Sequence, residues 1–469
     1  MPLKKDPSDP SSTSMAWDLM APKWDMMNTI LAGTQAMRDS GEVYLPRHDS
    51  ESASNYDERL NRCTLFNMTE LTLCTWVGKP FSDPVKLNED VPQEIINITD
   101  DIDLQGDSIT VMARDWFREA LSKSFAHILI DMPSIPDSIN GQQRTKADDL
   151  RMNIRPYWSL IRPENVIFAE SQVVNGQEML THVRIRETLV KRVGFVETLV
   201  ERIRILEPGT FSVWELTPKS KSSKKMVWSE VESGQTGLNE IPLVTFYADR
   251  SGLMEGKPPL EDLAHLNIRH WQSTADQINI LTVSRFPMLA VSGAADQTGD
   301  TMVIGPRQLL GTKDSAGRFY YVEHSGRAIA SGKEDLADLE EQMASYGAEF
   351  LKRATGNQTA TGRALDSSEA MSPLQDMVVR FTESMNEALD ITAKWLNLES
   401  GGTVDIATDF SISGQSDAEL RTLTEARKNG DLSQVDFLRE LKNRGILSDD
   451  FSITQGVIDS AVDPNVSLT

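Results

Sequence analysis

The chain of 469 residues is 39% apolar and 25% charged, a composition typical of ordered proteins, which excludes a largely disordered polymer. Its 47 Lys and Arg residues face 70 Asp and Glu residues, which gives a formal net charge of −23. This balance argues against a protein that reads DNA sequence, because such proteins bind phosphates through many basic side chains. The longest apolar stretch, around residues 125–130, is far shorter than the roughly 18 residues of a membrane span, so no membrane association is expected.

Only two cysteines are present, Cys63 and Cys74. Their spacing fits neither a zinc site nor a redox CxxC motif, so we expect two free thiols. No charged-then-apolar leader is recognisable at the N-terminus. Together these features predict a protein that folds in a reducing cytosol without export.

The first half of the sequence predicts helices followed by antiparallel strands. Residues 1–14 are polar and rich in Pro and Ser, which predicts a disordered tail. An apolar strand is predicted at 127–130, and alternating Val, Ile, Thr and Trp from residue 157 to 247 predict antiparallel strands with hairpin loops. Apolar residues at helical spacing predict three helices, over 15–37, 55–76 and 107–124.

The second half is dominated by long helices. A Gly-rich β segment over 286–332 and a polar loop over 354–368 separate them, and a strand is predicted near 404–412. The whole chain therefore predicts an α+β fold. Apolar stripes predict long helices over 258–285, 333–353 and 369–399, and capping signals predict two short ones over 416–430 and 433–445.

The sequence contains one stretch similar to a phosphate-binding loop, from Gly326 to Lys333. Five residues rather than four separate its glycines, and Glu334 stands where a Ser or Thr would hold magnesium. We therefore do not predict a nucleotide site there.

Candidate metal sites are equally weak. Asp101 and Asp103 have calcium-loop spacing, but Met112 stands where a bidentate Glu is required, so a capped turn is favoured. His265 and His270 are five residues apart and fall on different faces of a helix. No acid–base couple or nucleophile motif can be named. We expect no enzyme activity, no cofactor and no metal.

Many short motifs in one fixed order resemble the portal proteins of tailed bacteriophages, in particular a subgroup first catalogued as a family of unknown function. The segment 122–126 departs from that pattern, since a glycine is expected before the strand and none is present. The matching segments are Trp24, Tyr44–Pro46, Tyr56–Arg62, Phe66–Pro80, Asp103–Leu121, Ile128–Pro133, Arg155–Trp158, Pro163–Ile167, Pro259–Asn267, Asp276 and Phe286–Pro287.

The resemblance implies a portal fold with a helical stem and crown, a mixed wing containing antiparallel strands, and a small β-containing clip. The implied segments are a wing over 15–257, stem helices over 258–285 and 333–353, a clip over 286–332, a tunnel loop over 354–368, a long helix with a wing strand over 369–414, and a crown over 415–469.

A portal of this kind is a dodecameric ring at one capsid vertex, through which double-stranded DNA passes during packaging and ejection without being read in sequence. The implied partners are the major capsid protein, a scaffolding protein, the terminase large subunit and then head–tail adaptor or tail proteins. The implied location is the virion, with assembly in the host cytoplasm. A metal-dependent phage hydrolase or nuclease, and a minor capsid or scaffolding protein, remain alternatives.

The implied site residues are basic and amide side chains in two segments. For Lys352 and Arg353, compensation of the helix dipole is an equal alternative to DNA contact. For the basic residues of the clip, solubility alone is the more common role of exposed Lys and Arg side chains. The residues expected to face DNA at the tunnel loop are Lys352, Arg353, Asn357, Gln358 and Arg363, and those expected to dock terminase or adaptor at the clip are Arg307, Lys313 and Arg318.

Overall fold

The computed structural model divides into two compact units, Met1–Thr408 and Asp409–Thr469. In the second unit, helix α13 (Gln434–Asn443) is preceded by Ser433, whose hydroxyl accepts a hydrogen bond from the Asp436 amide at 3.1 Å. This confirms the predicted start of the last short helix. The structure describes residues 6–133, 138–139, 142–143, 151–218, 226–284, 288–292, 316–322, 327–349, 372–408, 423–428 and 433–443.

The first unit begins with a group of helices. The single helix predicted over 55–76 is wrong, because Cys63 adopts an extended backbone and the Asn67 side chain caps a new helix by accepting the Glu70 amide. The elements of this group are α1 (Met15–Leu31), α2 (Thr34–Asp39), η1 (Gly41–Val43), α3 (Ala53–Arg62) and α4 (Met68–Gly78).

A turn rich in aspartate then leads into a buried helix. Asp103 Oδ1 accepts the amides of Gln105 and Asp107 at 2.8 and 3.1 Å, and Asp101 Oδ1 accepts the Gly106 amide at 2.7 Å. The favoured capped turn is thus confirmed. The elements are β1 (Lys86–Leu87), α5 (Gln93–Ile96), η2 (Thr99–Asp101) and α6 (Ile109–Lys123).

A three-stranded antiparallel sheet forms the centre of the unit. Its middle strand β2 (Phe125–Asp131) confirms the predicted apolar strand and pairs with β11 (Leu243–Tyr247) and β5 (Tyr157–Ile161). Ser124, between α6 and β2, has φ +83°, the conformation that favours glycine. Ser124 therefore stands where the portal resemblance expects a glycine, and it adopts the backbone conformation of one. Its hydroxyl donates to the Asp249 carbonyl at 2.7 Å.

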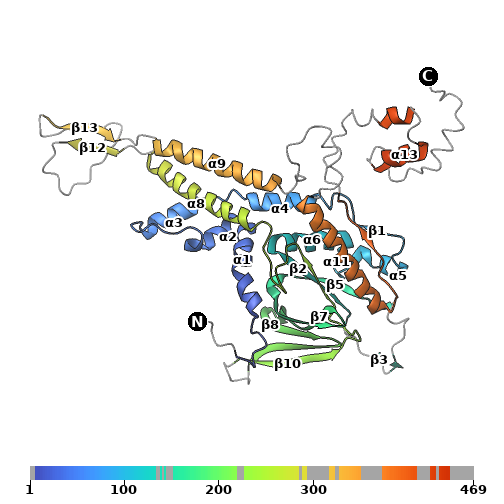
Figure 1. The fold of residues 1–469 in the computed structure, drawn as a ribbon. Coiled ribbons are helices and arrows are strands. Elements are labelled where there is room, and N and C mark those ends of the chain that lie inside the picture. Colours follow the sequence, from blue (N-terminus) through green and yellow to red (C-terminus); the bar gives the residue numbers. More distant parts are fainter. Residues whose placement is uncertain are drawn as a thin grey trace. The chain divides into compact units, whose positions relative to one another are not determined.

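A five-stranded antiparallel meander lies beside this sheet and confirms the predicted hairpins (Figure 1). Part of the segment predicted to be a disordered tail contacts the meander, because the Arg184 guanidinium donates to the Pro10 carbonyl at 3.0 Å and to the Ser12 hydroxyl at 3.1 Å. The strands are β6 (Val166–Val174), β7 (Gln177–Val193), β8 (Val196–Glu207), β9 (Thr210–Pro218) and β10 (Met226–Gln235), with η3 (Pro163–Asn165) before them and the small pair β3 (Ser138–Ile139) and β4 (Gln142–Gln143) outside.

Long helices follow, as predicted, and complete an α+β fold. Helix α9 begins six residues before the predicted start, so the end of the expected clip segment is helical. The remaining elements are α8 (Glu261–Ser284), β12 (Met288–Ser292), β13 (Arg318–Val322), α9 (Arg327–Glu349), α11 (Pro373–Leu396) and β14 (Val404–Asp405), which pairs with β1.

An aromatic cluster joins the sheet to the helices that cover it. Trp116 and Phe117 of α6, Phe246 of β11 and Phe381 of α11 are all fully buried, with ring centroids of contacting pairs 4.9–6.4 Å apart. Such pairs contribute roughly 0.5–1.5 kcal/mol each beyond their buried area. Helix α11 is thereby held to the first half of the chain, although more than 100 residues separate it from β11.

Burial of His127 at the centre of the sheet makes the folding stability depend on pH. Its ring is fully buried in β2, with Nδ1 2.8 Å from Thr245 Oγ1, and burial lowers the pKa of His127 to about 3. Below about pH 6.5 the His127 imidazole is protonated in the unfolded chain but stays neutral in the folded chain. The free energy of unfolding therefore falls as the pH drops from about 6.5 toward 3.

We predict that His127→Gln removes roughly 3 kcal/mol of this acid-induced loss, measured as the change in unfolding free energy between pH 7 and pH 4. The exposed His265 on α8 provides the matched control, His265→Gln. Equal pH dependence in His127→Gln and in the unsubstituted protein would contradict this assignment.

Candidate functional site

Helices α8 and α9 form an antiparallel pair (Figure 1). Near one end the Gln277 side-chain amide donates to the Ile329 carbonyl at 2.9 Å, and near the other the Tyr346 hydroxyl donates to the Pro259 carbonyl at 3.3 Å. A Cβ added at Gly332 would lie 2.2 Å from Gln277 Oε1, so a larger residue there would displace the Gln277 side chain. The two predicted stem helices therefore lie side by side along most of their length.

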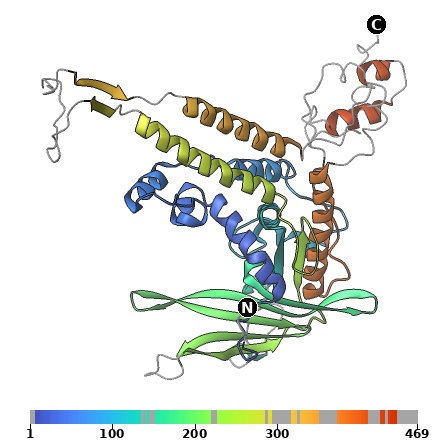
Figure 2. The same cartoon turned by 60° about the vertical axis from the view of Figure 1, so that its left-hand side comes forward.

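The hairpin β12–β13 lies between these helices in the chain, with Met288 opposite Val322 and Ser292 opposite Arg318. Figure 2 shows it beyond the ends of α8 and α9 that it connects. Arg318, expected to dock partners, is exposed at the start of β13. The remaining predicted site residues lie outside the described part of the chain, namely Arg307, Lys313, Lys352, Arg353, Asn357, Gln358 and Arg363.

The outer face of α9 is acidic. Glu334, Asp338 and Glu341 are exposed at a spacing that places them on one side of the helix, and no ion pair joins them to a described residue. Two other acids of α9 face α8 instead, where Asp335 pairs with Arg269 at 3.1 Å and Glu340 lies 3.4 Å from His270. One side of the helix pair thus carries uncompensated negative charge.

A buried arginine fixes α8 to the N-terminal helices. The side chain of Arg59 on α3 is 1% exposed, and it donates to both carboxylate oxygens of Glu51 at 2.9 and 2.7 Å. It also reaches Asp276 of α8 at 3.2 Å and the Pro46 carbonyl at 2.9 Å. These hydrogen bonds lower the pKa of the Glu51 carboxyl, so the pair stays charged.

A second polar contact fixes α8 nearer its start, at Asn267. Asn267 is fully buried, and its Oδ1 accepts both the amide and the hydroxyl of Thr69 at 3.1 Å. Its Nδ2 donates to the Phe66 carbonyl at 2.9 Å. All hydrogen-bonding groups of this amide side chain except one donor are thus engaged by the start of α4. The helix pair is tied through α8 to a rigid base.

Several of the anchoring residues belong to the motifs of the portal resemblance. Pro46, Arg59, Asn267 and Asp276 lie in four separate motifs, and the structure brings them together in two neighbouring contacts. Sequence analysis assigned them no role, although a lone Asn among Leu263, Leu266 and Trp271 signals a buried polar contact. Their hydrogen bonds hold the N-terminal helices against α8, which is a structural role.

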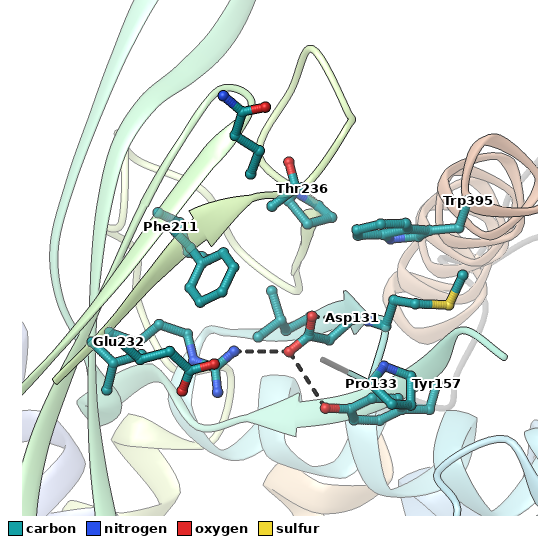
Figure 3. Close-up of a pocket in the computed structure, with 14 residues that line it drawn as sticks. Asp131, Pro133, Tyr157, Phe211, Glu232, Thr236 and Trp395 are labelled. Carbon is teal, nitrogen blue, oxygen red and sulfur yellow. Dashed lines mark hydrogen bonds and ion pairs between the residues drawn. The ribbon is translucent and has the colours of Figure 1, made fainter. Parts of the chain in front are cut away.

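A cleft of about 360 Å³ lies where the two sheets meet the end of α11 (Figure 3). Its walls come from β2, β5 and strands β8–β10, and Trp395 lies over one side. Inside it, Asp131 Oδ2 accepts the Arg204 guanidinium at 2.8 Å and the Tyr157 hydroxyl at 3.4 Å. Burial, with the nearby Asp131 charge, raises the pKa of Tyr157 to about 12. The cleft therefore combines apolar side chains with polar ones, and the Asp131 carboxylate at its base is paired with Arg204.

Other sequence-level candidates have ordinary structural roles. Residues 327–333 of the stretch similar to a phosphate loop form the first turns of α9. His265 is exposed while His270 is buried beside Glu340, so the two histidines face different ways. Within the described residues, no group of three or more His, Cys, Asp or Glu side chains is placed to hold a metal ion. No described helix is both long and apolar enough to cross a bilayer.

The family whose profile matches the sequence is described as "Domain of unknown function (DUF4055)", and it matches residues 259–396. This range contains α8, the β12–β13 hairpin, α9 and α11. No curated protein matches the sequence.

Structural similarity extends over most of the chain but is weak. The structure described as "Virion of native gene transfer agent (GTA) particle" has a TM-score of 0.40 and 12% identity, covering 88% of this chain and 99% of its own. "Neck of empty GTA particle computed with C6 symmetry" has a TM-score of 0.43 and 9% identity, covering 87% and 99%. "Neck of native GTA particle computed with C12 symmetry" has a TM-score of 0.39 and 9% identity, covering 80% and 89%. TM-scores this low establish neither fold nor function.

We predict that Arg59→Met lowers the free energy of unfolding by about 3–5 kcal/mol, because it leaves Glu51, 6% exposed, charged and without its partner. Urea denaturation followed by tryptophan fluorescence measures this loss. The control is Arg62→Met on the same helix, whose exposed pair with Glu58 contributes at most about 0.5 kcal/mol. Similar losses in both variants would show that the buried ion pair does not fix the helices.

Proposed function

We propose that this chain is a portal subunit of a tailed bacteriophage or phage-like particle, twelve copies of which form a ring around passing double-stranded DNA. The observation that carries the proposal is the antiparallel α8–α9 pair with a β-hairpin at its connected end, followed by the long helix α11. The motifs that resemble portal proteins contain the residues that fix α8 to the N-terminal helices, which also supports the proposed portal function.

The parts of the chain take the following roles in this proposal. The α8–α9 pair is the stem, and the hairpin with Arg318 is in the clip, where terminase docks first and head–tail adaptor proteins later. Residues 15–257 form a wing toward the capsid protein, 354–368 a tunnel loop and 415–469 a crown. The chain carries no catalytic activity, since the motor that it binds hydrolyses ATP.

The acidic face of α9 suits a conduit that DNA passes without being held. A duplex is a dense polyanion, and tight binding to it needs basic side chains that replace its counterions. Glu334, Asp338 and Glu341 do the opposite, since they repel phosphates over about one Debye length, roughly 8 Å in physiological salt. We propose that this face lines the channel.

Mass photometry and negative-stain imaging of the purified protein test the ring. We expect particles of about a dozen subunits with a central hole and no magnesium-dependent nuclease activity. A monomer that cleaves DNA with magnesium would favour a hydrolase instead. A protein that forms neither rings nor nuclease products, but joins capsids at many positions, would favour a minor capsid or scaffolding role.

Charge reversal tests the role of the acidic face. We predict that Glu334→Lys, Asp338→Lys and Glu341→Lys together raise the ring's affinity for duplex DNA and steepen its salt dependence, by up to about 0.9 in log–log slope per new phosphate contact. Fluorescence anisotropy with labelled DNA across a salt series measures both. Three Lys substitutions at the exposed acids Glu42, Asp57 and Glu58, far along the chain on η1 and α3, are the control. An equal gain in both triple variants would contradict the assignment.

A further inference from the structure

The hairpin formed by β7 and β8 projects beyond the sheet. Pairing of β7 with β6 ends at Ile185 and pairing of β8 with β9 begins at Arg202, so residues 188–201 pair only with each other. Figure 2 shows this arm reaching past the other strands of the meander. A two-stranded ribbon alone is marginally stable in water, so an arm of this length is suited to contact another surface.

The tip of the arm is apolar and fully exposed. The turn is Gly194–Phe195, with Gly194 at φ +64°, and the Phe195 side chain is 98% exposed. Val193 and Leu199 beside it are 74% and 72% exposed. A projecting aromatic residue among aliphatic ones is typical of the anchor residues of protein interfaces. No described residue of the same chain covers it.

The cleft under Trp395 has the complementary properties. Its walls include the aromatic side chains of Phe211 and Trp395 beside polar ones, and its rim carries Glu232, exposed and joined by no ion pair to a described residue (Figure 3). At the arm tip Arg192 is exposed and joined by no ion pair to a described residue, whereas Lys191 is paired with Glu215 at 2.7 Å and Glu197 lies opposite Arg192 in the hairpin. The unpaired Glu232 at the rim and the unpaired Arg192 on the arm are thus opposite in charge, and Phe211 and Trp395 of the cleft are apolar partners for an aromatic ring.

The two surfaces lie at opposite ends of one sheet. Strand β8 starts at the arm tip, and its last residues, Arg204 and Leu206, line the cleft. Twelve residues of strand separate the ends by roughly 35–40 Å, so Phe195 cannot reach the cleft of its own chain. A projection at one end and a recess at the other is the arrangement of a heterologous interface, which adds copies in one direction and closes into a ring.

We propose that the arm of each subunit inserts Phe195 into the cleft under Trp395 of the adjacent subunit. The occupant is thus a second copy of this chain, and Arg192 pairs with Glu232 across the contact. This inference rests on the proposed ring and names two surfaces that hold it together.

Cross-linking between cysteines tests the contact. In a Cys74→Ser background, which leaves only the buried Cys63, Phe195→Cys is combined with Thr236→Cys in the cleft and treated with a short bismaleimide. Denaturing gels are expected to show a ladder of covalent multimers extending beyond dimers, and only monomers for either single variant. The control combines Phe195→Cys with Val173→Cys. The Val173 side chain is 75% exposed and lies outside the cleft, at the end of the sheet that carries the cleft.

Ring formation is scored separately by mass photometry, so the two proposals fail in different ways. Intact rings without a ladder, or with an equal ladder in the Val173 control, would overturn the arm contact alone. A ladder from a protein that forms no rings would overturn the proposed portal while keeping the contact. Phe195→Asp should weaken ring assembly roughly 30-fold or more, while Val173→Asp should leave it unchanged. Equal assembly of both variants would count against the proposal.

Discussion

The buried guanidinium of Arg59 is the constraint on which the arrangement of the helices depends. It is enclosed by Glu51, Asp276 and the Pro46 carbonyl, so three chain segments must meet for its charge to be satisfied. Removing one partner of such a buried pair leaves an unpaired ion in a poorly hydrated site, which costs several kcal/mol. The same contact brings α3 against α8, and the neighbouring Asn267 brings α4 against it.

This anchoring divides α8 into two functional halves. From Asn267 to Asp276 the helix contacts the N-terminal helices, whereas its last turns, beyond Gln277, lie beside α9. A helix of 24 residues is about 36 Å long, so a rigid base at one end directs the hairpin at the other. In a ring, this arrangement would carry docking forces from the hairpin into the body of each subunit.

The sequence predicts the long helices and the antiparallel strands because their apolar periodicities extend over many residues. It misses the break after Arg62, where helical spacing continues although Cys63 is extended. It also predicts too late a start for α9, because Gly326 and Gly332 suggest a loop, whereas Gly332 lies inside the helix beside the Gln277 side chain. The burial of Arg59 and the cleft depend on partners far away in the sequence, so local patterns cannot reveal them.

Hydrogen–deuterium exchange of the intact protein tests most directly whether α8 is fixed to the body of the subunit. The account predicts that amides from Leu263 to Ala275 are as strongly protected as those of β2, because both belong to one buried core. It predicts weaker protection toward Ser284, where α9 is the main neighbour. Uniformly fast exchange along α8, with β2 still protected, would contradict the account.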